Sequence, residues 1–324
     1  MRKLLVILVL VVGLGLTACE GGDTGERGDS VPFIGGTQGV SVTFLDRFPP
    51  DRILDGGEES FDVIVELTNE GETEVGADDI TVTLSGFSPS VFGVTSGELV
   101  LNAPELLEAN ELNPDGSIIS SFPVEVEFND FIHEGTVAGT QEYPFRANVC
   151  YEYSTDVVTS ICVKDNFRDD SEDSDLCSVT SARTSYNSAA PVQITSLEQT
   201  PAGQDSTRFV FTVENLGNGR VFQTGSPCDS SLSRTEDKVY VDVSYLQEMP
   251  EISSVSCNGL RDGNEDYVGF VDISNDLEGS QRQGGEVFCT VEFNEQSPRV
   301  DRFDIELSYA YEETARTSVI VENN

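Results

Sequence analysis

The chain has no tryptophan, one histidine and three lysines among its 324 residues. Without tryptophan it lacks the Cys…Trp…Cys core of immunoglobulin domains. The single histidine, His133, has no partner motif, so we interpret it as a surface loop residue rather than a ligand or base. No Asn-x-Ser/Thr acceptor occurs either, and N-glycosylation is therefore not expected.

Positive charge is scarce as well. The 18 basic residues face 58 acidic ones, which gives a formal net charge of −40. This balance excludes nucleic-acid binding through phosphates. The acidic residues are spread along the chain, and their mutual repulsion destabilises a compact state in dilute buffer. At ~1 M salt the Debye length falls to ~3 Å, so most of this repulsion between carboxylates is screened. The composition favours a halophilic host; the alternative is an acidic surface protein from ordinary salinity.

No apolar run long enough to span a membrane follows the first residues. Arg2 and Lys3 precede the apolar tract Leu4–Leu16. At ~1.5 Å per residue this tract is too short to cross ~30 Å of hydrocarbon, and its length is typical of a secretory signal. Leu16-Thr17-Ala18-Cys19 resembles the lipobox of prokaryotic lipoproteins, which implies cleavage before Cys19 and a lipid on its sulfur. We therefore expect a signal peptide at 1–18, a lipidated flexible tether at 19–38, and an exported protein on the outer face of the cytoplasmic membrane. The alternative is an ordinary signal peptide cut nearby.

The remaining cysteines also lack a close pair. Without a C-x2-C spacing a zinc site is not indicated. An even number of cysteines in an exported chain predicts disulfides instead. The residues concerned are Cys150, Cys162, Cys177, Cys228, Cys257 and Cys289.

Two stretches of sequence recur. "VELTNEG" at Val65–Gly71 matches "FTVENLG" at Phe211–Gly217, and Phe145–Val163 aligns without a gap on Phe303–Val321. In the second alignment the "YEY" that starts at Tyr151 meets "YAY". The chain is thus a duplicated domain, with about a dozen extra residues in the second copy.

Both copies read as β-structure. Large apolar residues alternate with polar ones, the period of a strand with one buried face. Only Ala103–Asn110 suits a short helix. We therefore predict an all-β fold of two tandem Ig-like antiparallel β-sandwiches at 39–165 and 191–322, joined by an acidic linker at 166–190. The expected strands are Val40–Phe44, Phe61–Leu67, Ile80–Leu84, Val124–Phe128, Phe209–Val213, Val239–Val243 and Phe303–Tyr311.

Six cysteines allow fifteen disulfide maps, and strand geometry favours one of them over its main rival. A hairpin centred on Asp156 would set Cys150 opposite Cys162 on the outer face. The second copy would then be cross-linked by a Cys257–Cys289 disulfide, which leaves Cys177 to pair with Cys228. The rival map pairs Cys162 with Cys177 and Cys150 with Cys228.

Several segments also resemble a known group of proteins. These are "FLDRFPPDRILDGGEESFDVIVELTNEG", "LSGFSPSVF", "NPDGS", "CYEYSTDVVTSIC" and "APVQITSLEQ". Together they resemble a family of exported two-domain proteins from small-celled archaea, over most of residues 39–322. The strand followed by Asn-x-Gly more loosely resembles bacterial CARDB-type adhesion modules. The resemblance implies tandem Ig-like sandwiches on a cell surface and carries no activity or functional residues.

Candidate chemistry is sparse. Gly28-Asp29-Ser30 lacks the helix and oxyanion element of an esterase, and the tripeptide starting at Arg27 is too common to indicate integrin binding. An acidic run in the linker offers several oxygens to Ca²⁺, but it lacks the glycine and terminal glutamate of an EF-hand, so a solvated linker is favoured. Because no nucleophile, base and orienting group can be named, we predict a non-enzyme without a cofactor. The acidic run contains Asp169, Asp170, Glu172, Asp173 and Asp175.

The sequence thus predicts a lipid-anchored, non-enzymatic surface protein whose sandwiches bind a neighbouring protein or glycan through their loops. No small-molecule substrate and no nucleic acid is indicated. One alternative is a structural subunit of an envelope layer or filament, with the apolar island Val31–Ile34 added to a neighbour's sheet edge. A second alternative, a solute-binding lipoprotein, needs a cleft between α/β lobes, and no βα alternation is visible.

Overall fold

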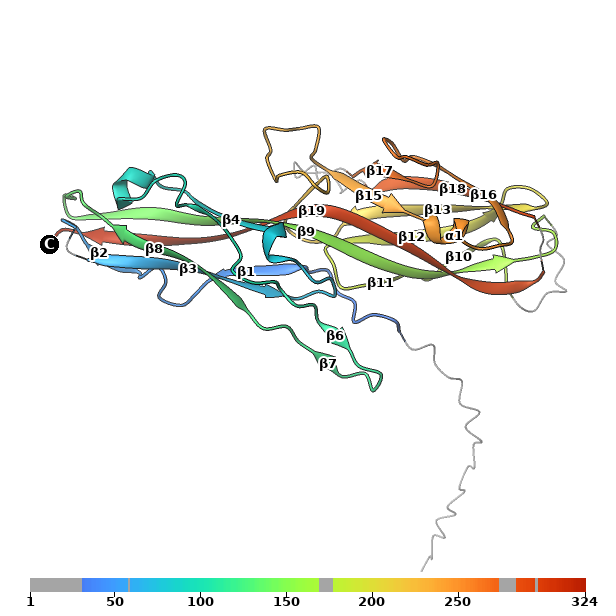
Figure 1. The fold of residues 1–324 in the computed structure, drawn as a ribbon, viewed down its shortest axis with the longest axis horizontal. Helices are drawn as coiled ribbons and strands as arrows, with labels where there is room; N and C mark the ends of the chain where they lie inside the picture. Colours follow the sequence, from blue (N-terminus) through green and yellow to red (C-terminus); the bar gives the residue numbers. More distant parts are fainter. Residues whose placement is uncertain (1–30, 58, 169–176, 274–283, 295–296) are drawn as a thin grey trace, which may run out of the picture. The chain divides into compact units, whose positions relative to one another are not determined.

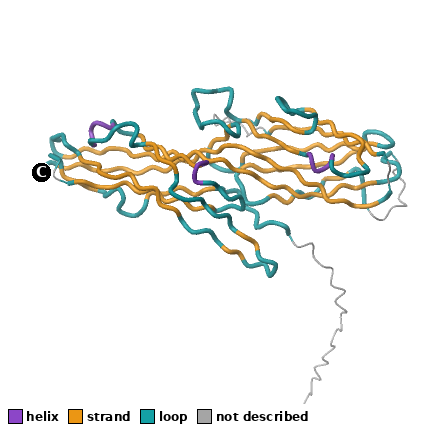
Figure 2. Tube along the Cα trace, viewed as in Figure 1, coloured by secondary structure: helices purple, strands orange, loops and turns teal. Residues whose placement is uncertain are grey.

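The computed structural model describes residues 31–57, 59–168, 177–273, 284–294 and 297–324. Strands in which buried and exposed side chains alternate with a period of two make up almost all of the regular secondary structure in these residues. Strands dominate the trace, and helical segments are short (Figure 2). All seven strands expected from the sequence are present. Their observed ends differ from the expected ones by a few residues at most, except in the long strand that contains Phe303–Tyr311. The predicted class is confirmed: the fold is all-β, with antiparallel sheets arranged as β-sandwiches.

The strands form four sheets (Figure 1). A three-stranded sheet has the order β1 (Val40–Phe44), β3 (Ser60–Asn69), β8 (Val124–Ile132). A five-stranded sheet has the order β10 (Ser181–Ala182), β12 (Val192–Pro201), β13 (Ser206–Asn215), β18 (Gly285–Phe293), β16 (Ile252–Asn258). β6 (Glu111–Leu112) and β7 (Ile118–Ile119) form a separate hairpin.

The fourth sheet has nine strands and serves both copies of the repeat. Its main path is β17 (Val268–Asp272), β15 (Lys238–Asp242), β19 (Arg299–Glu322), β9 (Thr140–Val163), β4 (Ile80–Ser85), β5 (Val100–Asn102). β11 (Tyr186–Asn187) joins β9, while β14 (Arg220–Phe222) and β2 (Arg52–Leu54) join β19. The β2 pairing is parallel, whereas the other pairings between described strands are antiparallel.

Ring contacts show which sheets face each other. In the first sandwich, Phe61 of β3 packs on Phe145 of β9, with ring centroids 6.4 Å apart. In the second, Phe209 of β13 packs on Phe303 of β19 at 5.0 Å. Each small sheet therefore covers a different part of the nine-stranded sheet, and the buried apolar residues between the layers form a continuous core.

The two longest strands are shared between the sandwiches. β9 and β19 pair antiparallel over all 24 residues of each, from Thr140 opposite Glu322 to Val163 opposite Arg299. The predicted turn near Ser154–Asp156 is wrong, because Thr155, Val157 and Ile161 continue the buried series of β9 past this point. The division at 166–190 stays a prediction. The structure adds that the second half of each copy's last strand lies against the other copy.

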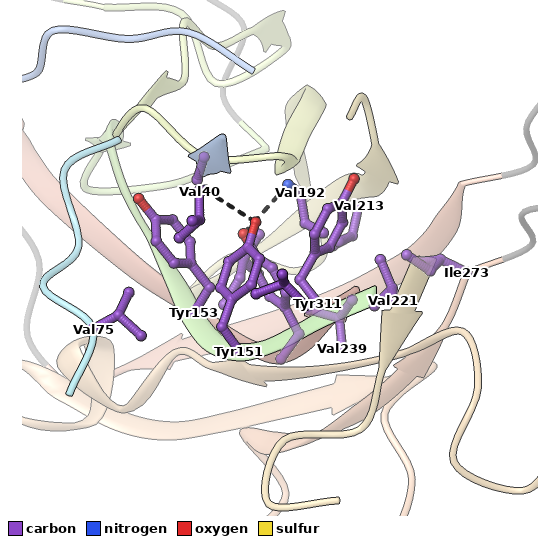
Figure 3. Packing of buried hydrophobic residues seen from close by; sticks show 14 of the residues in the cluster. Val40, Val75, Tyr151, Tyr153, Val192, Val213, Val221, Val239, Ile273 and Tyr311 are labelled. Carbon is purple, nitrogen blue, oxygen red and sulfur yellow. Dashed lines mark hydrogen bonds between the residues drawn. The ribbon is translucent and has the colours of Figure 1, made fainter. Parts of the chain in front are cut away.

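A cluster of four tyrosines marks the centre of this pairing. Tyr151 lies opposite Tyr311, and Tyr153 lies opposite Tyr309. The ring centroids of these two pairs are 5.8 and 6.4 Å apart, and all four tyrosines are buried. Figure 3 shows Tyr151, Tyr153 and Tyr311 among the valines around them. The repeated aromatic positions therefore form the junction at which the two copies meet.

The repeated Asn-x-Gly motif holds these tyrosines. In the first copy the Tyr153 hydroxyl donates to Asn69 Oδ1 at 3.0 Å, and that oxygen also accepts the Gly71 N–H at 3.0 Å. A Cβ at Gly71 would collide with the Tyr153 hydroxyl. In the second copy Tyr311 donates to Asn215 Oδ1 at 3.2 Å in the same way. The motif is thus an Asx turn whose glycine leaves room for a tyrosine.

All six expected disulfide cysteines are paired, but the favoured map is wrong. The bonds are Cys150–Cys228, Cys162–Cys177 and Cys257–Cys289, which is the rival map. The Cys257–Cys289 bond belongs to both predicted maps and is the one correct bond of the favoured map. Since β9 runs straight on instead of turning, Cys150 and Cys162 lie twelve residues apart along one strand and do not meet.

The helix predicted at Ala103–Asn110 is also wrong. This segment is a loop pinned by an antiparallel bridge between Val75 and Leu107. The described helical segments are α1 (Ser244–Gln247) and two 3-10 turns, Ala77–Asp79 and Pro89–Phe92. Proline at the start and Gly93 in the left-handed region explain the bounds of the last one.

Candidate functional site

A pocket of about 260 Å³ opens on the outer face of the nine-stranded sheet. β9, β19 and β15 supply its floor, α1 one wall, and the segment before β1 another. Phe33 and Tyr245 contribute aromatic side chains, and Tyr245 is 37% exposed. Its floor comes from both copies, so the pocket exists only because β9 extends beside the second copy.

Carboxylates dominate the floor. Asp156 of β9 lies opposite Glu306 of β19, and Glu306 lies opposite Asp242 of β15. Asp304, two residues from Glu306, lies on the same face. Like charges directly opposite each other destabilise a sheet, so this row of carboxylates has an energetic cost.

The surroundings of the Asp156 carboxyl change its acidity. Burial, followed by the negative charges of Asp304 and Glu72, raises the pKa of Asp156 above its ordinary value. Asp304 is partly neutralised, because Arg302 Nε donates to its Oδ1 at 2.6 Å. Asp242 accepts the Ser244 N–H at 2.7 Å and so fixes the start of α1. The pocket therefore presents acceptor oxygens beside two aromatic side chains.

The structure corrects the interpretation of His133. The residue is 3% exposed, so it does not lie in a surface loop. Its Nε2 lies 3.3 Å from the Tyr143 hydroxyl, and its ring packs at 5.7 Å from Phe92. Period-two alternation after Phe131 turns it inward, a signal that its polar neighbour Glu134 hides.

Other sequence candidates lie outside the described residues. These are the lipid site Cys19, the motifs around Gly28, and the acidic run Asp169, Asp170, Glu172, Asp173 and Asp175. Among the described residues, no group of three or more His, Cys, Asp or Glu side chains is placed to hold a metal ion. The Ca²⁺ hypothesis stays untested.

The sequence missed the pocket itself. Phe33 belongs to the apolar island Val31–Ile34, but the sequence pattern assigns that island to the edge of a neighbour's sheet and not to a pocket. The backbone N–H groups of Ile34 and Gly35 bind the Glu72 carboxylate of the same chain at 2.9 and 3.2 Å. Tyr245 gave no signal, because its position depends on contacts between segments far apart in sequence.

Helices of the described part of the chain are all too short or too polar to cross a bilayer. In the comparison with known proteins, no family model and no curated relative matches the chain. Among solved structures, the chain has a weak similarity to the serine-rich repeat adhesion glycoprotein from Streptococcus agalactiae, at 11% identity. The match covers 84% of this chain and 87% of that one, with a TM-score of 0.18. A likeness at this level carries no argument about function.

Proposed function

We propose that the protein is a non-enzymatic, lipid-anchored surface protein that binds a glycan in the pocket between β9, β15 and β19. The lipobox-like segment ending at Cys19 supports export and anchoring. The three disulfides are consistent with an oxidising compartment outside the cytoplasm.

The observation that carries the binding role is the combination of Phe33 and Tyr245 with a row of carboxylates. Sugar hydroxyls donate hydrogen bonds, and ionised carboxylates only accept them. The apolar face of a sugar ring packs on an aromatic side chain, as other apolar surface does. Because the floor consists of strands from one continuous sheet, the acceptors are held rigidly.

Binding to a glycan array tests the proposal. The exported chain should retain a set of glycans, and Tyr245→Ala and Asp156→Asn should each weaken that binding about tenfold or more, the loss of one good contact. Leu232→Ala and Glu125→Gln are matched controls, because both side chains are exposed away from the pocket. Equal binding by all four variants, or no glycan retained by the folded chain, would contradict the proposal.

A further inference from the structure

The hairpin β6–β7 carries a concentration of exposed apolar side chains. Ile118 and Ile119 are 51% and 52% exposed, and Phe122, just beyond β7, is 78% exposed. Figure 1 shows the hairpin standing away from the sheets, so both of its faces are uncovered. An apolar group of this kind on a strongly acidic protein marks an interaction surface.

The tip of the hairpin remains polar. Asn113 accepts the Gly116 N–H at 2.9 Å and closes the turn. The Asp115 carboxylate accepts both the hydroxyl and the N–H of Ser117, and these bonds lower the pKa of Asp115 below its ordinary value. Asp115 therefore stays charged, and the hairpin is suited to lie along a water–lipid boundary rather than to penetrate tip first.

One turn holds both the root of this hairpin and the start of the folded chain. At the root, Asn110 donates its N–H to Gly71 O at 2.8 Å, and the Ser121 hydroxyl donates to Asn69 O at 2.7 Å. The next residue, Glu72, binds the backbone of Ile34. The first residues of the folded part and the root of the apolar hairpin are thus held by a single turn, 69–72.

The length of the preceding chain limits the distance to a membrane. The residues from Cys19 to Pro32 reach at most roughly 45 Å when fully extended. A lipid on Cys19 therefore keeps turn 69–72, and with it the hairpin root, close to the bilayer. Salt at molar concentration screens the repulsion between Asp115 and anionic headgroups.

We infer that the β6–β7 hairpin is a second membrane contact, whose Ile118, Ile119 and Phe122 side chains lie in the interfacial layer of the bilayer. This inference rests on the proposed anchoring at Cys19. The occupant is a lipid surface. It follows that the tether does not let the sandwiches move freely above the membrane but that the hairpin holds them in one orientation.

The absence of tryptophan allows a direct test. Phe122→Trp gives the full lipidated chain a single indole, and the exposed position tolerates the exchange. On vesicles of phosphatidylcholine and phosphatidylglycerol, its emission should shift to the blue and be quenched by brominated acyl chains. Leu232→Trp, exposed in the second copy, is the matched control and should be neither shifted nor quenched.

The experiment distinguishes failure of the hairpin inference from failure of the proposed anchoring. If the chain floats with the vesicles but Trp emission from position 122 is unquenched, the anchoring stands and the inference is overturned. Failure of the chain to associate with vesicles contradicts the anchoring itself. A blue shift that depends on protein concentration without lipid would identify a protein contact and overturn the inference too.

Discussion

Glu152 lies directly opposite Ala310 in the pairing of β9 with β19, and the two are also equivalent positions of the repeat, separated by the same 158 residues as Phe145 and Phe303. The pairing is therefore symmetric about this point. A two-fold axis between identical subunits produces such a relationship. Here it occurs within one chain, so each copy supplies half of a strand to its counterpart.

This exchange gives the proposed binding site its rigidity. Asp156 belongs to the first copy, whereas Asp242, Asp304 and Glu306 belong to the second. Independent sandwiches joined by a linker would let these carboxylates move relative to one another. A continuous sheet fixes their spacing, which preorganises the acceptors.

Loss of an Asx turn should destabilise the junction. Asn69→Ala leaves the buried Tyr153 hydroxyl and the Gly71 N–H without their acceptor, at a cost of about 1–3 kcal/mol in the free energy of unfolding. Urea denaturation followed by circular dichroism measures this. Asn129→Ala, at an exposed position of β8, is the control and should unfold like the parent chain. Equal stability of the two variants would show that the motif does not hold the tyrosine.

Asp55 should make stability depend on pH. Its buried carboxylate accepts the N–H groups of Asn324 and Val137 at 2.9 and 2.7 Å, and these bonds lower its pKa. Its contribution is therefore complete above the unfolded pKa of about 3.9 and is lost as the pH falls through the lower folded value. Asp55→Asn should be less stable than the parent chain at pH 7, with the gap closing in acid. A gap that is the same at both pH values would refute this assignment.

Much of the fold could be predicted from the sequence, because a strand with one buried face has apolar and polar residues in alternation. The predicted bounds of β1 agree with the structure, and the equivalence of the two tyrosine pairs is visible in the repeat. The strand exchange was not predictable in this way. Ser154-Thr155-Asp156 has turn-forming composition, yet Thr155 is buried and hydrogen-bonds Val192 O at 2.6 Å, a partner that no local pattern identifies.

The same limit applies to the candidate site. Cys19 is recognisable because a lipobox is a short contiguous motif. The pocket residues Phe33, Asp156 and Tyr245 are brought together by tertiary structure. Exposed alternate positions of a strand are polar whether or not they bind a ligand, so the carboxylates of the pocket have the same pattern as solvated ones.

Folding should require salt. A charge of −40 with three lysines leaves most carboxylates without a cationic partner, and salt screens their repulsion. Dialysis from molar to millimolar salt should lower the melting temperature and then abolish the β signal in circular dichroism. A signal and melting temperature that are constant throughout would refute the halophile hypothesis.

Strand exchange is the central structural claim, and one engineered cross-link tests it most directly. Asn148 of β9 lies opposite Thr314 of β19, and the Thr314 hydroxyl donates to Asn148 Oδ1 at 3.1 Å. Opposed residues of an antiparallel pair bring their Cβ atoms to ~4.5–5.5 Å, near the range of a disulfide. In independent sandwiches the two residues would lie in different domains.

The measurement is peptide mapping of the oxidised, folded double variant Asn148→Cys/Thr314→Cys. The control is Asn148→Cys/Glu306→Cys, which joins equivalent positions of the repeat that are not opposite each other, since Glu306 lies opposite Asp156. The exchanged pairing predicts a linked peptide containing positions 148 and 314 and no link in the control. Free thiols at 148 and 314 in the folded protein, or a link between 148 and 306, would contradict it.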